Sequence, residues 1–107
     1  MSCIFCSIVK KDKPAEIVFE DETLMAFKDI RPSAPVHILI VPRTHIDSLN
    51  DLKEQDKMLV GEMVLRAGHL ARGQGIAHGY RLQFNVGKDG GQIVPHLHLH
   101  LLGGWQT

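Results

Sequence analysis

The amino-acid sequence predicts a single α+β domain over residues 1–107, with an about five-stranded, mostly antiparallel sheet, one long helix and one short helix. Three observations predict this class. Short runs of strand-forming residues are separated by turns, one long stretch repeats apolar residues every three to four positions, and histidine alternates with leucine over residues 96–101. A chain of 107 residues can bury one hydrophobic core but is too short for two.

The first half of the chain predicts a short helix and three strands. Residues 3–10 have an apolar side and end before Pro14, while residues 16–19 and 23–28 flank a polar turn and are typical of a hairpin. Residues 36–41 are almost wholly apolar and predict a central strand. A lone histidine there, His37, is ordinarily a core polar group.

The second half predicts the long helix. Asp51 and Glu54 have the spacing of a capping box, and about five helical turns follow up to Gly73. Its apolar stripe suits packing against a sheet, and we expect both Met58 and Met63 to lie in the core. The stripe consists of Leu59, Met63, Ala67, Leu70 and Ala71.

Two further segments lead to the carboxyl terminus. Residues 79–86 alternate as a strand, and residues 87–92 form a flexible polar loop that opens onto the histidines. Adjacent glycines let backbone N–H groups approach an oxyanion such as phosphate.

The charge balance argues against several partners. Lysine and arginine together number 12, as do aspartate and glutamate, so the net charge is zero. Duplex nucleic acid normally requires a basic face, so no nucleic-acid partner is expected. We find no leader pattern and no stretch long enough to cross a bilayer, which predicts a cytoplasmic protein without a membrane partner.

Residues 96–102 hold three of the seven histidines at every second position. Read as a strand, this pattern sends the leucines into a core and sets the imidazoles roughly 6.5–7 Å apart on the other face. Solvated surface histidines, a metal site and a covalent reaction centre are the three interpretations. One metal does not suit all three, because His96 and His100 are about 13 Å apart along a strand. Covalent catalysis needs only an imidazole nucleophile and a neighbouring imidazole that binds phosphate or carries a proton.

The pattern His-φ-His-φ-His-φ-φ over residues 96–102 resembles the signature of the histidine triad superfamily of nucleotide hydrolases and transferases. The rest of the chain is similar to the Hint branch of that superfamily. The similar segments are residues 17–21, 26–30, 34–42, 79–81, 85, 89–92 and 102–104.

The resemblance implies a role for each matching position. His98 matches the nucleophile that forms a nucleotidyl-histidine intermediate, His100 the residue on the α-phosphate, and His37 the supporting fourth histidine. His96 is the first histidine of the triad. Asn85, Gly91 and Gln92 match the positions at which the family binds phosphate, and Asp29 matches the carboxylate that binds the ribose hydroxyls. The apolar positions that enclose the purine in the family correspond to Phe5, Ile8, Phe27 and Ile30. The family fold dimerises into one continuous larger sheet through the long helix and a strand, so a homodimer is expected.

The chain also departs from that branch. Isoleucine stands at position 93, where the branch usually has a serine whose hydroxyl lies near the scissile bond. Pro95 replaces a common aromatic residue, and relatives continue beyond the position of Thr107 with a tail that shapes leaving-group preference. Substrate choice therefore does not transfer with the resemblance.

Cys3 and Cys6 need two further ligands to form a closed zinc site, and His45 and His96 are the candidates. Many relatives with this pair resemble zinc proteins that have such a set. The alternative is two reduced thiols on a short helix, whereas a thioredoxin-like role lacks its βαβ context. With a structural zinc, His96 would serve structure while His98 and His100 serve chemistry, and catalysis itself would need no cofactor.

The resemblance implies a nucleotide-binding hydrolase that cleaves the P–N bond of adenosine 5′-phosphoramidates, releasing AMP and an amine. A dinucleoside polyphosphate hydrolase of a sister branch is the alternative enzyme. A zinc-stabilised nucleotide-binding or scaffold protein with little turnover is the alternative from another class.

Overall fold

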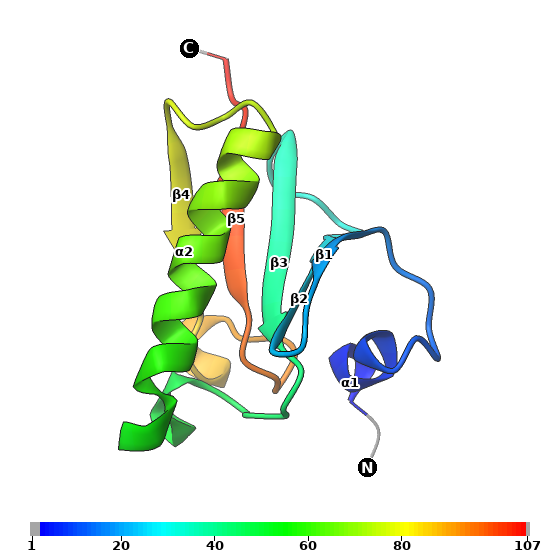
Figure 1. Ribbon diagram of the computed structural model, residues 1–107, viewed down its shortest axis with the longest axis vertical. Coiled ribbons are helices and arrows are strands. Elements are labelled where there is room, and N and C mark those ends of the chain that lie inside the picture. The colour runs from blue at the N-terminus through cyan, green and yellow to red at the C-terminus, as the bar shows by residue number, and fades with distance from the viewer. Residues whose placement is uncertain (1–2, 107) are drawn as a thin grey trace.

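The computed structural model describes residues 3–106 and contains one five-stranded antiparallel sheet flanked by two helices (Figure 1). The strand order is β1-β2-β3-β5-β4. The elements are α1 (Ile4–Val9), β1 (Ile17–Glu20), β2 (Leu24–Lys28), β3 (Val36–Pro42), α2 (Lys57–Gly73), β4 (Tyr80–Gln83) and β5 (Leu99–Gly103). The predicted fold class is confirmed.

The two faces of the sheet carry different cores. Ile38 and Ile40 of β3 pack with Leu99 and Leu101 of β5 beneath α2, whose residue Ala67 is fully buried among them. On the opposite face, residues of period two on β2 and β3 pack against two residues of α1. The strand residues are Met25, Phe27, Leu39 and Val41, and the helix residues are Phe5 and Ile8. His37 shares this second face, because it lies two residues before Leu39.

The long helix starts later than the capping-box spacing predicts. Asp51 and Glu54 lie in two separate 3₁₀ turns, Leu49–Asp51 and Glu54–Asp56, and α2 begins only at Lys57. Local side-chain bonds support the turns, since the Asp56 carboxylate accepts from the Lys53 amide at 2.9 Å. The predicted end is confirmed, because Gly75 adopts a left-handed φ of 75° just after the helix.

Met58 was expected in the core, and this prediction is wrong. Its side chain is 72% exposed on the first turn of α2, whereas Met63 is fully buried. The helix presents only a narrow stripe to the sheet, so one methionine of the pair falls outside it.

The histidine strand is also shorter than predicted. β5 begins at Leu99, and the backbone before it bonds elsewhere: the Leu97 amide donates to the Ile46 carbonyl at 2.6 Å. The alternation survives this departure, since Leu97 remains in the α2-side core while His98 and His100 lie on the other face. β4 is likewise only four residues long.

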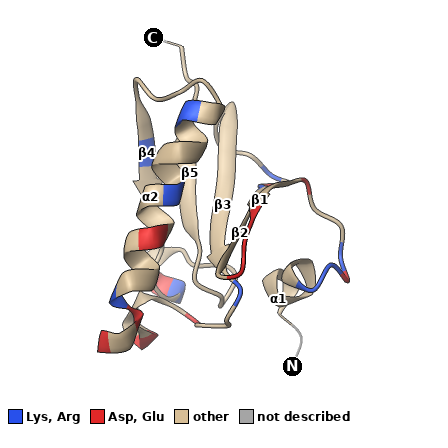
Figure 2. Ribbon diagram, in the orientation of Figure 1, with Lys and Arg blue, Asp and Glu red and all other residues tan. Residues whose placement is uncertain are grey.

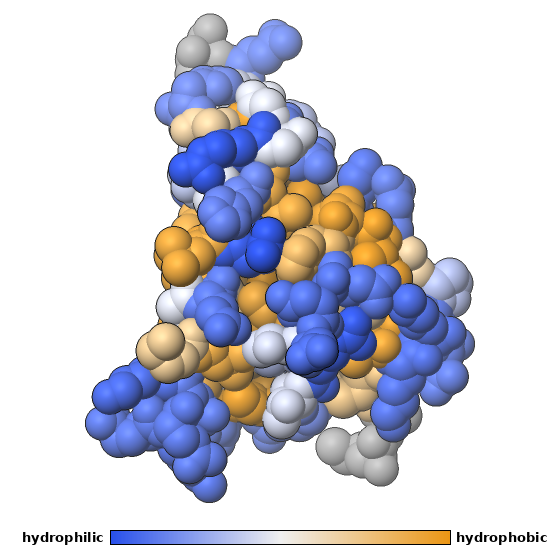
Figure 3. Space-filling model, in the orientation of Figure 1, coloured by the Kyte–Doolittle hydropathy of each residue, from blue (hydrophilic) through white to orange (hydrophobic). Residues whose placement is uncertain are grey.

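Charged residues lie outside the central strands. Figure 2 shows β3 and β5 without a charged residue and charges of both signs along α2 and the β1–β2 region. Figure 3 shows exposed apolar residues on the face that α2 occupies, and Met58, Val64 and Leu65 are exposed on that helix. No helix within residues 3–106 is both long and apolar enough to cross a membrane.

Candidate active site and metal centre

A cavity of about 640 Å³ opens on the α1 side of the sheet. It brings together residues from α1 and the segment after it, the end of β2 and the connection to β3, β3 itself, the segment from Asn85 to His98, and β5. Of the predicted site residues, its lining contains Phe5, Ile8, Phe27, Asp29, Ile30, His37, Asn85, Gly91, His98 and His100. Gln92 and His96 are not in the lining.

The predicted purine contacts form an apolar end of the cavity. The Phe5 and Phe27 rings meet edge to face with centroids 5.4 Å apart, and Ile8 is buried beside them. Ile30 is 85% exposed at the rim. An aromatic and aliphatic surface of this kind suits the flat face of a heterocycle.

Asp29 follows this apolar end. One carboxylate oxygen accepts from the Arg31 amide at 2.8 Å, and the other lies 3.5 Å from Nε2 of His37. The carboxylate is therefore fixed in place with acceptor capacity on the cavity side, which suits a diol.

Hydrogen bonds fix the tautomers of His37 and His100. The Ser33 amide donates to Nδ1 of His37 at 3.0 Å, so a neutral His37 carries its hydrogen on Nε2. That nitrogen lies 2.9 Å from Nδ1 of His100, which must accept. His100 therefore carries its own hydrogen on Nε2 and can donate it to an anion in the cavity.

A hydrogen bond fixes the other tautomer in His98, with the hydrogen on Nδ1. Its Nδ1 lies 2.7 Å from the carbonyl oxygen of His96, which can only accept. The hydrogen of a neutral His98 is therefore on Nδ1, and Nε2 keeps its lone pair. Its ring centroid lies 4.9 Å from that of His100 and 5.1 Å from that of Phe5, so a nitrogen with a lone pair lies next to a ring that can donate a hydrogen bond.

Burial keeps these imidazoles neutral. It is the largest cause that lowers the pKa of His37 and of His98, and it lowers the pKa of His100 to about 4, with smaller contributions from His98 and His37. Neutral rings are what a nucleophile and a hydrogen-bond relay need near pH 7.

The glycine loop borders the cavity and is held by its own bonds, since the Gly91 amide donates to the Lys88 carbonyl at 3.0 Å. Gly91 has a φ of 84°, which a side chain would strain, and a Cβ there would lie 3.4 Å from Nδ2 of Asn85. Nδ2 of Asn85 donates to the Gly90 carbonyl at 2.9 Å, which ties the two ends of the loop together. Both Asn85 and Gly91 line the cavity, and Nδ2 of Asn85 has a second hydrogen that could be donated to a ligand.

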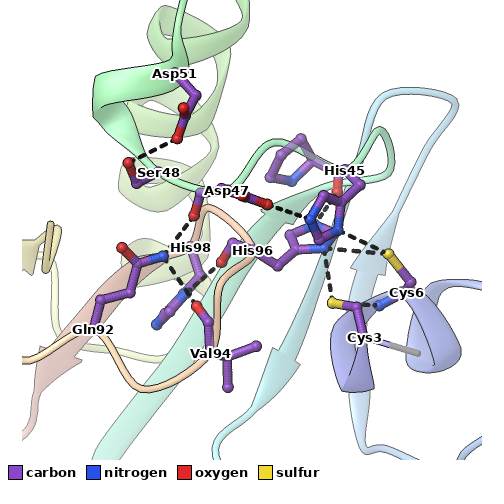
Figure 4. A network of polar contacts seen from close by, with 11 residues as sticks. Cys3, Cys6, His45, Asp47, Ser48, Asp51, Gln92, Val94, His96 and His98 are labelled. Carbon is purple, nitrogen blue, oxygen red and sulfur yellow. Dashed lines mark hydrogen bonds and ion pairs between the residues drawn. The ribbon is translucent and has the colours of Figure 1, made fainter. Parts of the chain in front are cut away.

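Gln92 lies within the loop instead of facing the cavity. Nε2 donates to the carbonyls of Asp47 and Val94 at 2.6 and 3.0 Å (Figure 4). Oε1 accepts from the Gly87 amide. All of these bonds hold the loop in shape. Direct phosphate contact by this side chain stays a prediction.

A second cluster lies behind the cavity, where Cys3, Cys6, His45 and His96 converge (Figure 4). Their potential ligand atoms all lie within 4.8 Å of one another. The four residues come from α1, the segment after β3 and the segment before β5, so the fold assembles the set that the sequence predicts.

The protonation of this cluster suits a metal. Nε2 of His96 lies 2.9 Å from the Pro42 carbonyl oxygen, and Nε2 of His45 lies 2.6 Å from a carboxylate oxygen of Asp47. Both Nε2 atoms therefore carry hydrogens, and both Nδ1 atoms face the sulfurs with free lone pairs. A carboxylate that orients a ligating histidine is a common feature of zinc sites.

The distances agree with a tetrahedral cation. Nδ1 of His96 lies 3.4 and 3.5 Å from the sulfurs of Cys3 and Cys6, and Nδ1 of His45 lies 3.2 Å from the Cys6 sulfur. Tetrahedral zinc with ordinary bond lengths separates sulfur and nitrogen ligands by about 3.5 Å. The residues therefore fit zinc. Burial and the nearby Cys3 raise the pKa of the Cys6 thiol, so a bound metal must displace its proton.

Asp29, His37 and His100 form another group whose potential ligand atoms are close together. The tautomers argue against a metal there. Nε2 of His37 carries a hydrogen, and the facing nitrogen of His100 already accepts it. These nitrogen atoms already take part in the hydrogen-bond relay from the Ser33 amide through His37 to His100.

Several lining residues were not found from the sequence. Leu39 lies two residues after His37 on β3 and so faces the same cavity, a period-two relation that the sequence contains. The Ser33 amide orients His37, and the Asp47 carboxylate orients His45 outside the cavity. No local sequence pattern predicts these two contacts.

Comparisons with known proteins identify the family of the chain. A family model described as "Scavenger mRNA decapping enzyme C-term binding" matches residues 2–105. Protein HitA of Neisseria gonorrhoeae is 43% identical over 102 residues, which are 95% of each chain. The crystal structure of a HIT family hydrolase from Legionella pneumophila shares 50% identity and a TM-score of 0.95, covering 98% of this chain and 95% of the other.

A zinc-bound histidine triad family protein from Mycobacterium smegmatis is also similar, with 37% identity, a TM-score of 0.83, and coverage of 95% of this chain and 74% of that one. The sheet, the paired histidines and these matches together define the class. The chain belongs to the histidine triad family.

Proposed function

We propose that this histidine triad hydrolase cleaves the P–N bond of purine nucleoside 5′-phosphoramidates, with adenosine 5′-phosphoramidates as its substrates. The observation that carries the proposal is the pair His98 and His100, one with a free lone pair and the other with a donor, at one cavity. The apolar wall accepts the base, Asp29 the ribose hydroxyls, and Asn85 and Gly91 the phosphate.

The mechanism follows from the tautomers. Nε2 of His98 attacks the α-phosphorus, the P–N bond breaks, and the amine leaves with its electron pair and a proton from solvent. The His96 carbonyl holds the Nδ1 hydrogen of His98 as that ring gains positive charge. Nε2–H of His100 stabilises the phosphoryl oxygens. Water then attacks phosphorus and gives a proton to solvent, the bond from phosphorus to Nε2 breaks, and AMP leaves a neutral His98.

The alternative enzyme, a dinucleoside polyphosphate hydrolase, has less support. Among the described residues, the lysines and arginines that line the cavity are Lys13, between α1 and β1, and Lys28 and Arg31, at and after the end of β2. Lys28 already pairs with Glu16 at 2.8 Å. The lining from residues 85–100 offers no cation for a polyphosphate leaving group, and it includes Ile93, which is 91% exposed.

We also propose a structural zinc ion at Cys3, Cys6, His45 and His96, which would brace the fold and take no part in bond cleavage. A homodimer is supported by β4, an edge strand exposed along its length, and by the exposed apolar residues Val64 and Leu65 on α2. The free thiols of Cys3 and Cys6 support a cytoplasmic location.

Mass spectrometry of enzyme quenched during turnover of adenosine 5′-phosphoramidate tests the function. We expect a nucleotidyl adduct on His98, no turnover by His98→Ala, and wild-type turnover by the exposed control His69→Ala. Tight AMP binding without turnover would instead indicate a binding protein. Faster cleavage of diadenosine polyphosphates than of the phosphoramidate would favour the alternative enzyme.

A further inference from the structure

Helix α1 contributes to both the metal cluster and the cavity. Cys3, which caps the helix, and Cys6 face His45 and His96, whereas Phe5 and Ile8 line the cavity wall. The two sets alternate within six residues of chain. Any displacement of the cysteines therefore displaces the wall.

Few contacts hold α1 in place. At six residues it is too short to persist as an isolated helix. Of the described side-chain hydrogen bonds, those that join α1 and its cap to the rest of the molecule run from the Cys3 and Cys6 sulfurs to His96 and His45. The remaining support is the apolar packing of Phe5 and Ile8.

Phe5 occupies the junction between the two sites. Its ring centroid lies 5.9 Å from that of His96 in the cluster, 5.1 Å from that of His98 in the cavity and 5.4 Å from that of Phe27. The position of Phe5 thus sets the depth of the apolar end.

The catalytic pair depends on different supports. His100 is held by His37 and through it by the Ser33 amide, while His98 is held by the His96 carbonyl. His96 is itself anchored by the Pro42 carbonyl and by the adjacent Leu97–Ile46 bond. These bonds to Pro42 and Ile46 do not involve α1, although the His96 ring also lies 3.4 and 3.5 Å from the Cys3 and Cys6 sulfurs.

We propose that Cys3, Cys6 and His45 are positioning residues for nucleobase recognition. A metal held by them together with His96 fixes α1, so that Phe5 and Ile8 form a firm wall for the base. Loss of the metal releases this wall and weakens base binding, while the chemistry at His98 and His100 continues. This inference rests on the proposed nucleotide function.

The test compares zinc-loaded and chelator-treated wild-type protein, with metal content measured in each. Titration calorimetry with AMP and with ribose 5-phosphate separates base binding from phosphate binding. We expect metal removal to weaken AMP binding by roughly tenfold and to leave ribose 5-phosphate affinity within about twofold. KM for adenosine 5′-phosphoramidate should rise similarly, with kcat nearly unchanged, and amide hydrogen exchange should accelerate in residues 4–10.

Two variants accompany this comparison. The double substitution Cys3→Ser/Cys6→Ser should reproduce the metal-free behaviour even when zinc is present. Ser7→Ala is the matched control on the same helix, because Ser7 is neither in the cluster nor in the cavity lining, and it should bind AMP as the wild type does.

The outcomes are distinct. Equal AMP affinity with and without zinc, an equal loss for both ligands, or global unfolding on metal removal would overturn the inference. So would a wild-type protein that takes up no zinc. Failure of the zinc-loaded protein to bind any purine nucleotide would instead overturn the proposed function.

Discussion

The carbonyl oxygen of His96 lies 2.7 Å from Nδ1 of His98, and this contact joins the candidate metal cluster to the proposed reaction centre. The two histidines are only two residues apart and both rings contact Phe5, yet they belong to different clusters. His96 is fully buried with Nδ1 toward the cysteine sulfurs, and His98 faces the cavity. The first histidine thus orients the second through its backbone while its ring points elsewhere.

The relay from the Ser33 amide through His37 to His100 predicts a tautomer effect. His37→Ala removes the donor to Nδ1 of His100, so His100 no longer has its hydrogen fixed on Nε2. We expect kcat to fall by about 10²-fold, the usual scale for a misplaced proton donor, with smaller change in KM. Steady-state kinetics check this. His37→Gln, whose amide nitrogen can donate, should recover part of the loss, and equal defects in both variants would contradict the relay.

The buried relay also makes stability depend on pH. The pKa of His100 falls from its ordinary 6.5 to about 4 on folding, with burial as the largest cause. Between these values the unfolded chain takes up a proton that the folded protein does not, so stability is full above about pH 6.5 and declines toward about pH 4. The lowered pKa of His37 acts in the same direction.

Urea unfolding at several pH values across this window measures the effect. The variant His100→Gln lacks the titrating ring, so its unfolding free energy should decline less steeply than that of the wild type. Parallel slopes for the two proteins would show that the decline arises from other groups.

The positions of the main histidines could be predicted because they recur at every second residue, as side chains on one face of a strand do. His98, His100 and His37 lie on strand faces, or on a continuation of one, and the alternation of apolar residues shows which face they share. The start of α2 could not be predicted in this way, because side-chain bonds such as Asp56 to Lys53 stabilise 3₁₀ turns where the capping-box spacing predicts a helix. The Gln92 amide bonds to the carbonyls of Asp47, 45 residues away, and Val94, two residues away. No local sequence pattern predicts these loop contacts.

Ile93 offers a test of leaving-group preference. It is 91% exposed in the cavity lining, so Ile93→Ser should change the free energy of unfolding by less than about 0.5 kcal/mol. The introduced hydroxyl can donate a proton near the scissile bond, whereas the lost side chain can no longer contact an apolar amine. We expect kcat to rise several-fold when the leaving group is a small amine such as ammonia. This rise corresponds to an activation barrier that is lower by roughly 1 kcal/mol.

Phosphoramidates with small and with aromatic amine leaving groups separate the two effects of this substitution. Ile93→Val is the control, because it keeps an apolar side chain without a hydroxyl. An equal change for every leaving group would show that position 93 does not contact that part of the substrate.

The exposed edge strand β4 predicts how two copies associate. Its residues Tyr80 and Leu82 are 38% and 37% exposed, and its unpaired edge can join that of a second copy into one continuous sheet. Leu82→Glu places like charges opposite each other across such an interface, and we expect a monomer by light scattering where the wild type is a dimer. The control Leu65→Lys tests α2 separately, because Leu65 is 68% exposed on that helix. A wild-type protein that is monomeric at high concentration, or an unchanged dimer in the Leu82→Glu variant, would exclude β4 as the interface.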